Sequence, residues 1–258
     1  MADSSSKGAG RAPQHFGETL GAIFARYPRL FATLLLVGAL LGLLLSVIES
    51  VQFKGLQLLE VGELPGGGFY VAVIAGLVGN AYFWTVALLR ADGILGGGDG
   101  GGAFSRAGGL LLPVIGYMVI YVLIVTTGLM LLALPGIFFA VLLTPGVILI
   151  VLRDSRVFAA LKRSAALVWG SWWFSLGVLL TVTLVAAIPL AIAEAFLAGL
   201  RGSSDPFDQV RFAGLNAAGM IVVLPLFASM GCTLLEALEA RKRNAMMEQD
   251  LFRRAGSR

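Results

Sequence analysis

Residues 107–152 read AGGLLLPVIGYMVIYVLIVTTGLMLLALPGIFFAVLLTPGVILIVL, a run without a charged side chain between Arg106 and Arg153. As one α-helix this run would be about 69 Å long, more than twice the ~30 Å hydrocarbon core of a bilayer. Leu134-Pro135-Gly136 interrupts it near the middle, which predicts two membrane spans joined by a tight turn. Because both ends of the run are basic, we expect these two ends to lie on the same, cytoplasmic side of the membrane.

The composition of the whole chain also indicates a membrane protein. Of 258 residues, 58% are hydrophobic and 13% are charged, whereas soluble proteins have about 25% charged residues. The single cysteine, Cys232, excludes a disulfide framework and a cysteine-based metal site. His15 has no metal-ligand neighbour in the sequence, so we expect no metal and no cofactor. The net charge of +4 follows membrane topology, and we expect no nucleic-acid partner.

Hydropathy predicts an all-α, polytopic integral membrane protein with six transmembrane helices. The expected spans cover residues 30–48, 69–89, 110–134, 136–152, 172–197 and 212–235. They belong to one domain over residues 16–240, between a disordered cytoplasmic N-terminus (1–15) and a basic cytoplasmic tail (241–258). Residues 1–14 contain no apolar stretch, so we expect the first span to serve as an uncleaved signal-anchor.

The distribution of positive charge predicts the orientation. Of 19 Lys and Arg residues, all but Lys54, Arg201 and Arg211 fall in segments that are cytoplasmic if both termini are cytoplasmic. This asymmetry follows the positive-inside rule.

The segment Asp154–Trp169 has the pattern of an amphipathic helix on the cytoplasmic membrane surface. Its expected apolar face consists of Val157, Phe158, Leu161, Ala165 and Val168. Asp154 or Ser155 can cap its start, and residues 16–31 repeat the pattern more weakly. Basic side chains and indole rings favour the headgroup zone. The residues expected to contact anionic lipid headgroups are Arg156, Lys162, Arg163, Trp169, Trp172 and Trp173.

Three polar residues within the expected spans are candidate functional groups, because ionisable and amide side chains are costly in a membrane. They are Asn80, Glu194 and Asn216. Asn80 either contacts a solute or, as the favoured reading, forms a hydrogen bond with another helix, through Thr126, Thr127 or Asn216. Glu194 either binds a cation or relays a proton. Its favoured reading is an ion pair with Arg201 or Arg211 at the outer interface.

The remaining sequence patterns indicate structural roles and not functional sites. Residues 96–102 contain G-x-G-x-x-G but follow a transmembrane helix and no strand, which indicates a linker. Gly38, Gly42 and Ser46 have the spacing that lets helices approach closely, and internal packing is the favoured role. Glu239 and Arg243 have the spacing of a solvated ion pair within one helix. No expected span contains paired carboxylates or a nucleophile beside a base, so we expect no enzyme activity.

One part of the chain resembles a known family. Leu134-Pro135-Gly136-Ile137 precedes a short span, and Phe158–Ser164 and Gly170-Ser171-Trp172-Trp173 follow it. This pattern, over about 70 residues, resembles the YciC-like bacterial inner-membrane proteins and the membrane domain fused to some glycerophosphoryl diester phosphodiesterases. The resemblance implies a six-helix protein of the bacterial inner membrane. It supplies no site residues, and the catalytic phosphodiesterase domain has no counterpart in this sequence.

Two functions remain open from the sequence. The first is a non-catalytic envelope protein that organises membrane lipids or partner proteins, as a homo-oligomer or with another membrane protein. The second is a transporter or channel for a small or lipidic solute. Transport predicts a polar cavity around Asn80, whereas a scaffold predicts a dry bundle with an exposed protein-binding face.

Overall fold

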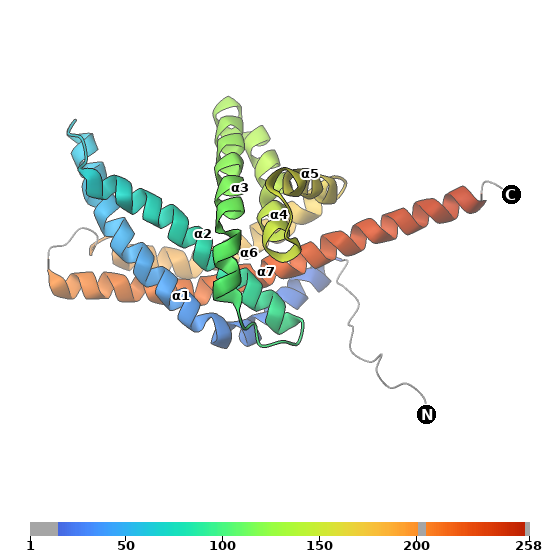
Figure 1. Cartoon of the computed structure of the whole chain (residues 1–258), viewed down its shortest axis with the longest axis horizontal. Coiled ribbons are helices and arrows are strands. Elements are labelled where there is room, and N and C mark those ends of the chain that lie inside the picture. The colour runs from blue at the N-terminus through green and yellow to red at the C-terminus, as the bar shows by residue number, and fades with distance from the viewer. Residues whose placement is uncertain (1–14, 201–204, 256–258) are drawn as a thin grey trace.

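The computed structural model describes residues 15–200 and 205–255, which form seven helices and, within these ranges, no strand (Figure 1). The helices are α1 (Phe16–Glu60), α2 (Gly67–Leu95), α3 (Ala103–Leu131), α4 (Ala133–Arg153), α5 (Val157–Val168), α6 (Trp172–Leu197) and α7 (Pro206–Ala255). Six of them, all except α5, are long and apolar enough to cross a membrane. The all-helical fold and the number of candidate spans agree with the sequence prediction.

Two helices are much longer than predicted. α1 has 45 residues and α7 has 50, which correspond to about 67 Å and 75 Å. Residues 16–31 are therefore the first part of α1 and not a separate surface helix. At its other end α1 continues past the predicted limit at Ile48 until Glu60, because the first residue that breaks the helix is Gly62, at φ +80°. Similarly, α7 continues through the basic residues after position 240.

The break between α3 and α4 lies three residues before the predicted Pro-Gly turn. Leu132 has extended backbone angles, and α4 begins at Ala133. Pro135 therefore lies in the first turn of α4, where its missing N–H has no partner to lose. Gly128 and Gly136 let the two helices cross near this break, because a Cβ on Gly128 would lie 2.9 Å from the Gly136 Cα atom.

The helices form two groups that diverge from each other. α1 packs along α7, with α2 beside α1 and α6 beside α7. Figure 1 shows α1, α2 and α6 on the left, with α7 running from there to the far right, whereas the α3–α4 hairpin points upward. The hairpin contacts the rest mainly through α2 and α5. Its divergence leaves large apolar side chains exposed far along α3, for example Met130 at 83%, as expected for a surface that faces lipid.

The two ends of the α1–α2–α6–α7 group differ in charge. We call the end with the α1–α2 and α6–α7 connections the acidic end; its acidic residues are Glu49, Glu60, Glu63, Glu194, Asp205 and Asp208. We call the opposite end the basic end; its basic residues are Arg26, Arg29, Arg90, Arg106, Arg153, Arg156, Lys162, Arg163, Arg241, Lys242 and Arg243. From the basic end α7 projects beyond the bundle (Figure 1).

The interface between α1 and α7 brings the two backbones into contact. A Cβ on Gly42 would lie 2.5 Å from the Ala217 Cα atom, and one on Gly38 would lie 2.9 Å from the Ile221 Cα atom. Both glycines thus serve internal packing, the role favoured from their spacing. Buried leucines continue the interface toward the basic end, including Leu34 on α1 and Leu224 on α7, both 0% exposed.

The amphipathic segment forms α5, but its buried face differs from the predicted one. The buried residues of α5 are Ala160, Ser164, Leu167 and Val168, and Phe158 is 72% exposed. The Ser164 hydroxyl donates a hydrogen bond to the Leu142 carbonyl, 2.7 Å away, which attaches α5 to α4. Asp154 does not cap α5; it ends α4 at φ +46° and pairs with Arg106.

Candidate functional site

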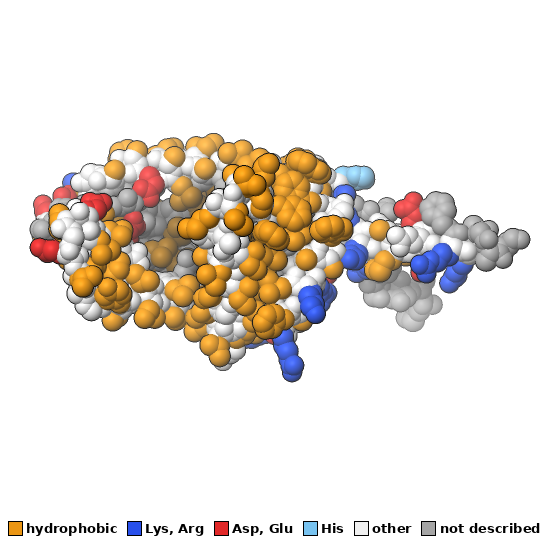
Figure 2. All heavy atoms as spheres, turned by 90° about the horizontal axis from the view of Figure 1, so that it is seen from above, with side chains coloured by type: hydrophobic (Ala, Val, Ile, Leu, Met, Phe, Trp, Pro, Cys, Tyr) orange, Lys and Arg blue, Asp and Glu red, His pale blue; other side chains and the backbone are white. Residues whose placement is uncertain are grey.

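A polar cavity of about 470 Å³ opens near the acidic end, among α1, α2, α6 and α7. Its polar lining residues are Glu49, Gln52, Asn80, Glu194 and Asn216, and its apolar lining includes Leu45, Leu190 and Met220. Figure 2 shows a hollow in this part of the molecule with acidic side chains on its margin. The volume lies in the range of about 300–1,000 Å³ that is usual for small-molecule sites.

All three polar residues singled out from the spans line this one cavity. Asn80 lies midway along α2, Glu194 near the end of α6, and Asn216 in the first part of α7. Thr126 and Thr127, two of the partners considered for Asn80, are exposed on α3 and do not line the cavity. The sequence indicated Asn80, Glu194 and Asn216 separately, and the structure brings all three together in one cavity.

Two amide atoms in the cavity wall are buried without a partner. Among the described residues, neither the Asn80 Oδ1 atom nor the Asn216 Nδ2 atom has a hydrogen-bond partner. Leaving a buried polar atom unsatisfied costs about 1–3 kcal/mol. An amide presents both an acceptor and donors, so the pair suits a ligand that can donate to one residue and accept from the other.

The ionisable side chains among the described lining residues of the cavity are both acidic. Glu49 and Glu194 line it, and no Lys or Arg is among the described residues that do so. Arg211, which the sequence offered as a partner for Glu194, lies 3.7 Å from Asp208 and stacks on the Phe207 ring at 4.4 Å. Arg201, the other candidate, lies outside the described residues. Two carboxylates beside two amides favour a ligand with a positive charge.

The sequence did not indicate Glu49 and Gln52 as site residues, because the first span was expected to end at Ile48. With α1 continuous, Leu45, Ile48, Glu49 and Gln52 share one face. Their spacing of three or four residues is the signal that could have found them. Gly76 on α2 lets α2 approach this face closely, since a Cβ there would lie 3.1 Å from the Ile48 Cγ2 atom and 3.7 Å from the Gln52 Nε2 atom.

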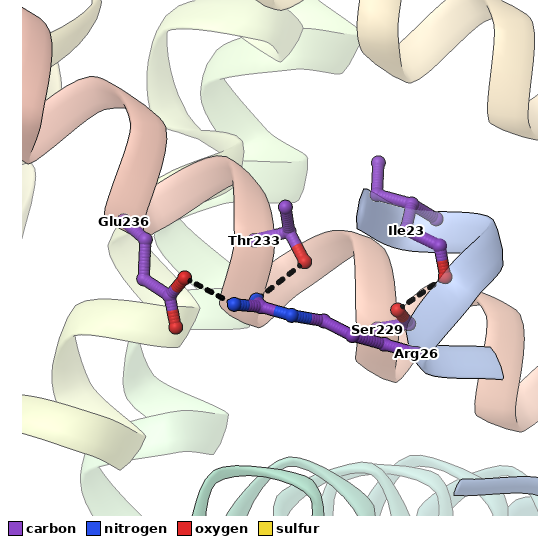
Figure 3. Close-up of polar contacts among 5 residues, drawn as sticks. All are labelled: Ile23, Arg26, Ser229, Thr233 and Glu236. Carbon is purple, nitrogen blue, oxygen red and sulfur yellow. Dashed lines mark hydrogen bonds and ion pairs between the residues drawn. The ribbon is translucent and has the colours of Figure 1, made fainter. Parts of the chain in front are cut away.

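At the basic end, polar contacts fasten α1 to α7 (Figure 3). Arg26 donates hydrogen bonds of 2.8 Å to both the Thr233 hydroxyl and the Glu236 carboxylate. One turn away, the Ser229 hydroxyl donates to the Ile23 carbonyl at 2.8 Å. Together with the glycine contacts at Gly38 and Gly42, these bonds hold α1 against α7 between the cavity and the basic end.

Glu239 connects three helices instead of pairing within α7. One of its carboxylate oxygens lies 3.1 Å from Arg153 on α4, and the other lies 2.9 Å from Arg163 on α5. Its side chain is only 18% exposed. The solvated pair expected between Glu239 and Arg243 is therefore wrong, because the ends of α4 and α5 bring two closer guanidinium groups.

The residues expected to contact lipid headgroups have different environments. Trp169 and Trp173 are 74% and 79% exposed. Trp172 instead stacks on Phe138, with the ring centroids 5.8 Å apart, and donates a hydrogen bond to the Phe138 carbonyl. Arg156 and Lys162 are exposed, and Arg163 is held by Glu239.

Comparisons of the chain with known protein families, with curated proteins and with solved structures find no match. The resemblance to YciC-like proteins therefore rests only on the residues quoted for it.

Proposed function

We propose that this chain is a multi-pass protein of the bacterial inner membrane that binds a small polar solute, bearing a positive charge, and transports it. The observation that supports this best is the polar cavity, where Asn80 and Asn216 present unpartnered buried amide atoms beside Glu49 and Glu194. A bundle used only as a scaffold has no reason to retain such a cavity, because buried unsatisfied polar atoms destabilise it.

The orientation in this proposal comes from the charge asymmetry of the two ends. With the basic end cytoplasmic, as the positive-inside rule predicts, the cavity lies in the external half of the bundle. The α1–α7 contacts at Gly38 and Gly42, and the Arg26–Glu236 pair, close the cytoplasmic side. A conformation open on one side and closed on the other is one of the two states that alternating access requires.

The proposal is tested by binding and flux with small amines as probes. The protein in nanodiscs is heated with ethanolamine or choline, and with glycolate as an anionic control. We expect the cations, and not glycolate, to raise the melting temperature, since a ligand bound only by the folded state stabilises it. Asn80→Leu should weaken binding by about ten- to a hundredfold, because one hydrogen bond to a charged group contributes about 1.5–3 kcal/mol.

Matched variants separate the cavity from general effects. Asn244→Leu changes an asparagine far along α7, and Glu63→Gln removes an exposed carboxylate next to α1; both should bind as the wild type does. Glu194→Gln should lose affinity for the cation. If no probe cation binds, or if Asn80→Leu and Asn244→Leu behave alike, the proposal is wrong. Binding with no uptake into proteoliposomes would retain the site but contradict transport.

A second function, the organisation of lipids or partner proteins, is favoured by the exposed apolar surface around α5. Phe158, Trp169 and Trp173 are each more than 70% exposed, and they suit the interfacial zone of a membrane. Under this function Asn80→Leu would change the assembly of the protein without any solute flux to lose.

A further inference from the structure

A second cavity, of about 390 Å³, lies at the basic end between α5 and α7. It is lined by Arg153, Arg163, Ala166, Leu167, Glu239, Lys242, Arg243 and Met246. It is separate from the polar cavity at the acidic end, with which it shares no lining residue. From its chemistry we propose that this pocket binds a phosphate group, supplied by the headgroup of an anionic phospholipid.

The charges of the pocket favour an anion. Four of its lining residues are cations, and Glu239 is the only carboxylate among the described residues that line it. Both oxygens of Glu239 already accept bonds, from Arg153 and Arg163. Arg153 also interacts electrostatically with the carboxylates of Asp92 and Glu236. Of the four cations, its charge is therefore the one most neutralised by neighbouring carboxylates. The other cations leave the pocket with an excess of positive charge.

Arg163 and Lys242 are held in place by hydrogen bonds, and the basic side chains of the pocket still have N–H donors that no described residue accepts. Arg163 gives one bond, to Glu239 at 2.9 Å, and a guanidinium has five N–H donors. Lys242 gives one bond, to the Ala166 carbonyl at 2.6 Å, and an ammonium has three donors. Arg243 has no ion pair or hydrogen bond with another described residue. Glu239 acts as a positioning residue, because its bond to Arg163 holds that guanidinium in the pocket wall.

The surroundings of the pocket favour a lipid over a free ion as the source of the phosphate. Ala166, Leu167 and Met246 give the pocket an apolar side. Trp169, two residues after Leu167, is 74% exposed, and Met247 is 58% exposed. Exposed indole rings lie at the headgroup level of a bilayer, and basic pockets there bind anionic headgroups. Figure 2 shows basic side chains where α7 leaves the bundle.

The proposed site differs from the lipid contacts expected from the sequence. Among the described residues, only Arg163 of that expected set lines the pocket; Arg156 and Lys162 do not. Lys242 and Arg243 belong to the segment that the sequence suggested was a cytoplasmic tail. They reach the pocket because α7 continues as a helix past Ala240 and passes α5.

The test is a binding measurement on the full chain in a neutral detergent. The probes are short-chain phosphatidylglycerol, short-chain phosphatidylcholine and inorganic phosphate. We expect phosphatidylglycerol to bind and to raise the melting temperature, phosphatidylcholine to bind at least tenfold more weakly, and inorganic phosphate to have no effect at the same concentration. Equal stabilisation by inorganic phosphate would overturn the lipid source, and no binding of either anion would overturn the site.

Variants of matched charge decide where the lipid binds. The double change Lys242→Gln and Arg243→Gln should lower the affinity for phosphatidylglycerol about thirtyfold, since each cation near an anionic surface contributes about a factor of five. The control changes Arg253→Gln and Arg254→Gln on the same helix, outside the pocket, and should keep the affinity. An equal loss in both would mean unspecific attraction to α7 and would contradict the pocket. Unchanged melting temperatures without lipid show that both variants fold.

Discussion

Gly42 shows how one residue without a side chain positions the wall of the polar cavity. Its neighbours across the α1–α7 interface are the Asn216 carbonyl and the Ala217 backbone, which a Cβ at position 42 would approach to 2.6 Å and 2.5 Å. No backbone atom can move out of the way as a flexible side chain can. The close approach therefore fixes the depth at which Asn216 enters the cavity.

Gly42→Ala should destabilise the protein, because the added methyl group must push α1 away from α7. Overpacking of this kind costs about 1–3 kcal/mol, which should lower the melting temperature measured by tryptophan fluorescence in detergent. Gly21→Ala is the matched control in the same helix, since a Cβ there has nothing within 4 Å. We expect that control to be neutral or slightly stabilising. Equal melting temperatures for the two variants would contradict the α1–α7 contact.

At the scale of elements, α1 and α7 are joined by a polar contact far from Gly42. Arg26 and Glu236 form an ion pair of 2.8 Å whose side chains are 25% and 38% exposed. The Thr233 hydroxyl accepts a second hydrogen bond from the Arg26 guanidinium. Because the pair is partly exposed, its contribution is limited by solvent, and it acts mainly to set the register of the two helices.

A double-mutant cycle with Arg26→Met and Glu236→Gln should give a coupling energy of about 1 kcal/mol in thermal or chemical unfolding. The control cycle uses Arg211→Met and Asp208→Asn, a longer contact of 3.7 Å between residues one turn apart within α7. Its coupling should be close to zero. If the Arg26–Glu236 coupling were no larger than the control, the pair would not contribute to the α1–α7 interface.

The sequence predicts the elements better than it predicts their lengths and contacts. Apolar runs of hydrocarbon thickness identify all six long helices, and the predicted bounds 172–197 agree with α6. Hydropathy detects only the part of a helix that lies in lipid, so it misses the polar turns at the ends of α1 and α7. The position of Pro135 misled the prediction of the turn, because proline is compatible with the first turn of a helix.

The candidate site was predictable only in part, for a physical reason. A polar side chain in an apolar run stands out by its cost, which identifies Asn80, Glu194 and Asn216. Their convergence depends on how four helices pack, and periodicity within one helix carries no such information. For the same reason the bridge from Glu239 to Arg163 could not be read from the spacing within α7.

At the scale of the whole molecule, both proposed sites depend on the orientation of the bundle. The acidic cavity serves an external solute, and the basic pocket meets anionic cytoplasmic lipid, only if the basic end is cytoplasmic. The structure offers good positions for a test, because the two ends carry exposed residues outside the long apolar runs. Cys232 is the single cysteine and is 2% exposed, so Cys232→Ser gives a background without reactive thiols.

In that background, Glu63→Cys and Asp205→Cys should react with a membrane-impermeant maleimide in intact cells, since both positions lie at the acidic end. Asp99→Cys, in the glycine-rich connection between α2 and α3, should react only after the cells are permeabilised. Labelling after permeabilisation is the control that shows that each thiol is accessible. The reverse pattern would place the polar cavity on the cytoplasmic side and the basic pocket outside. The solute would then enter from the cytoplasm, and the anionic lipid would have to come from the outer leaflet.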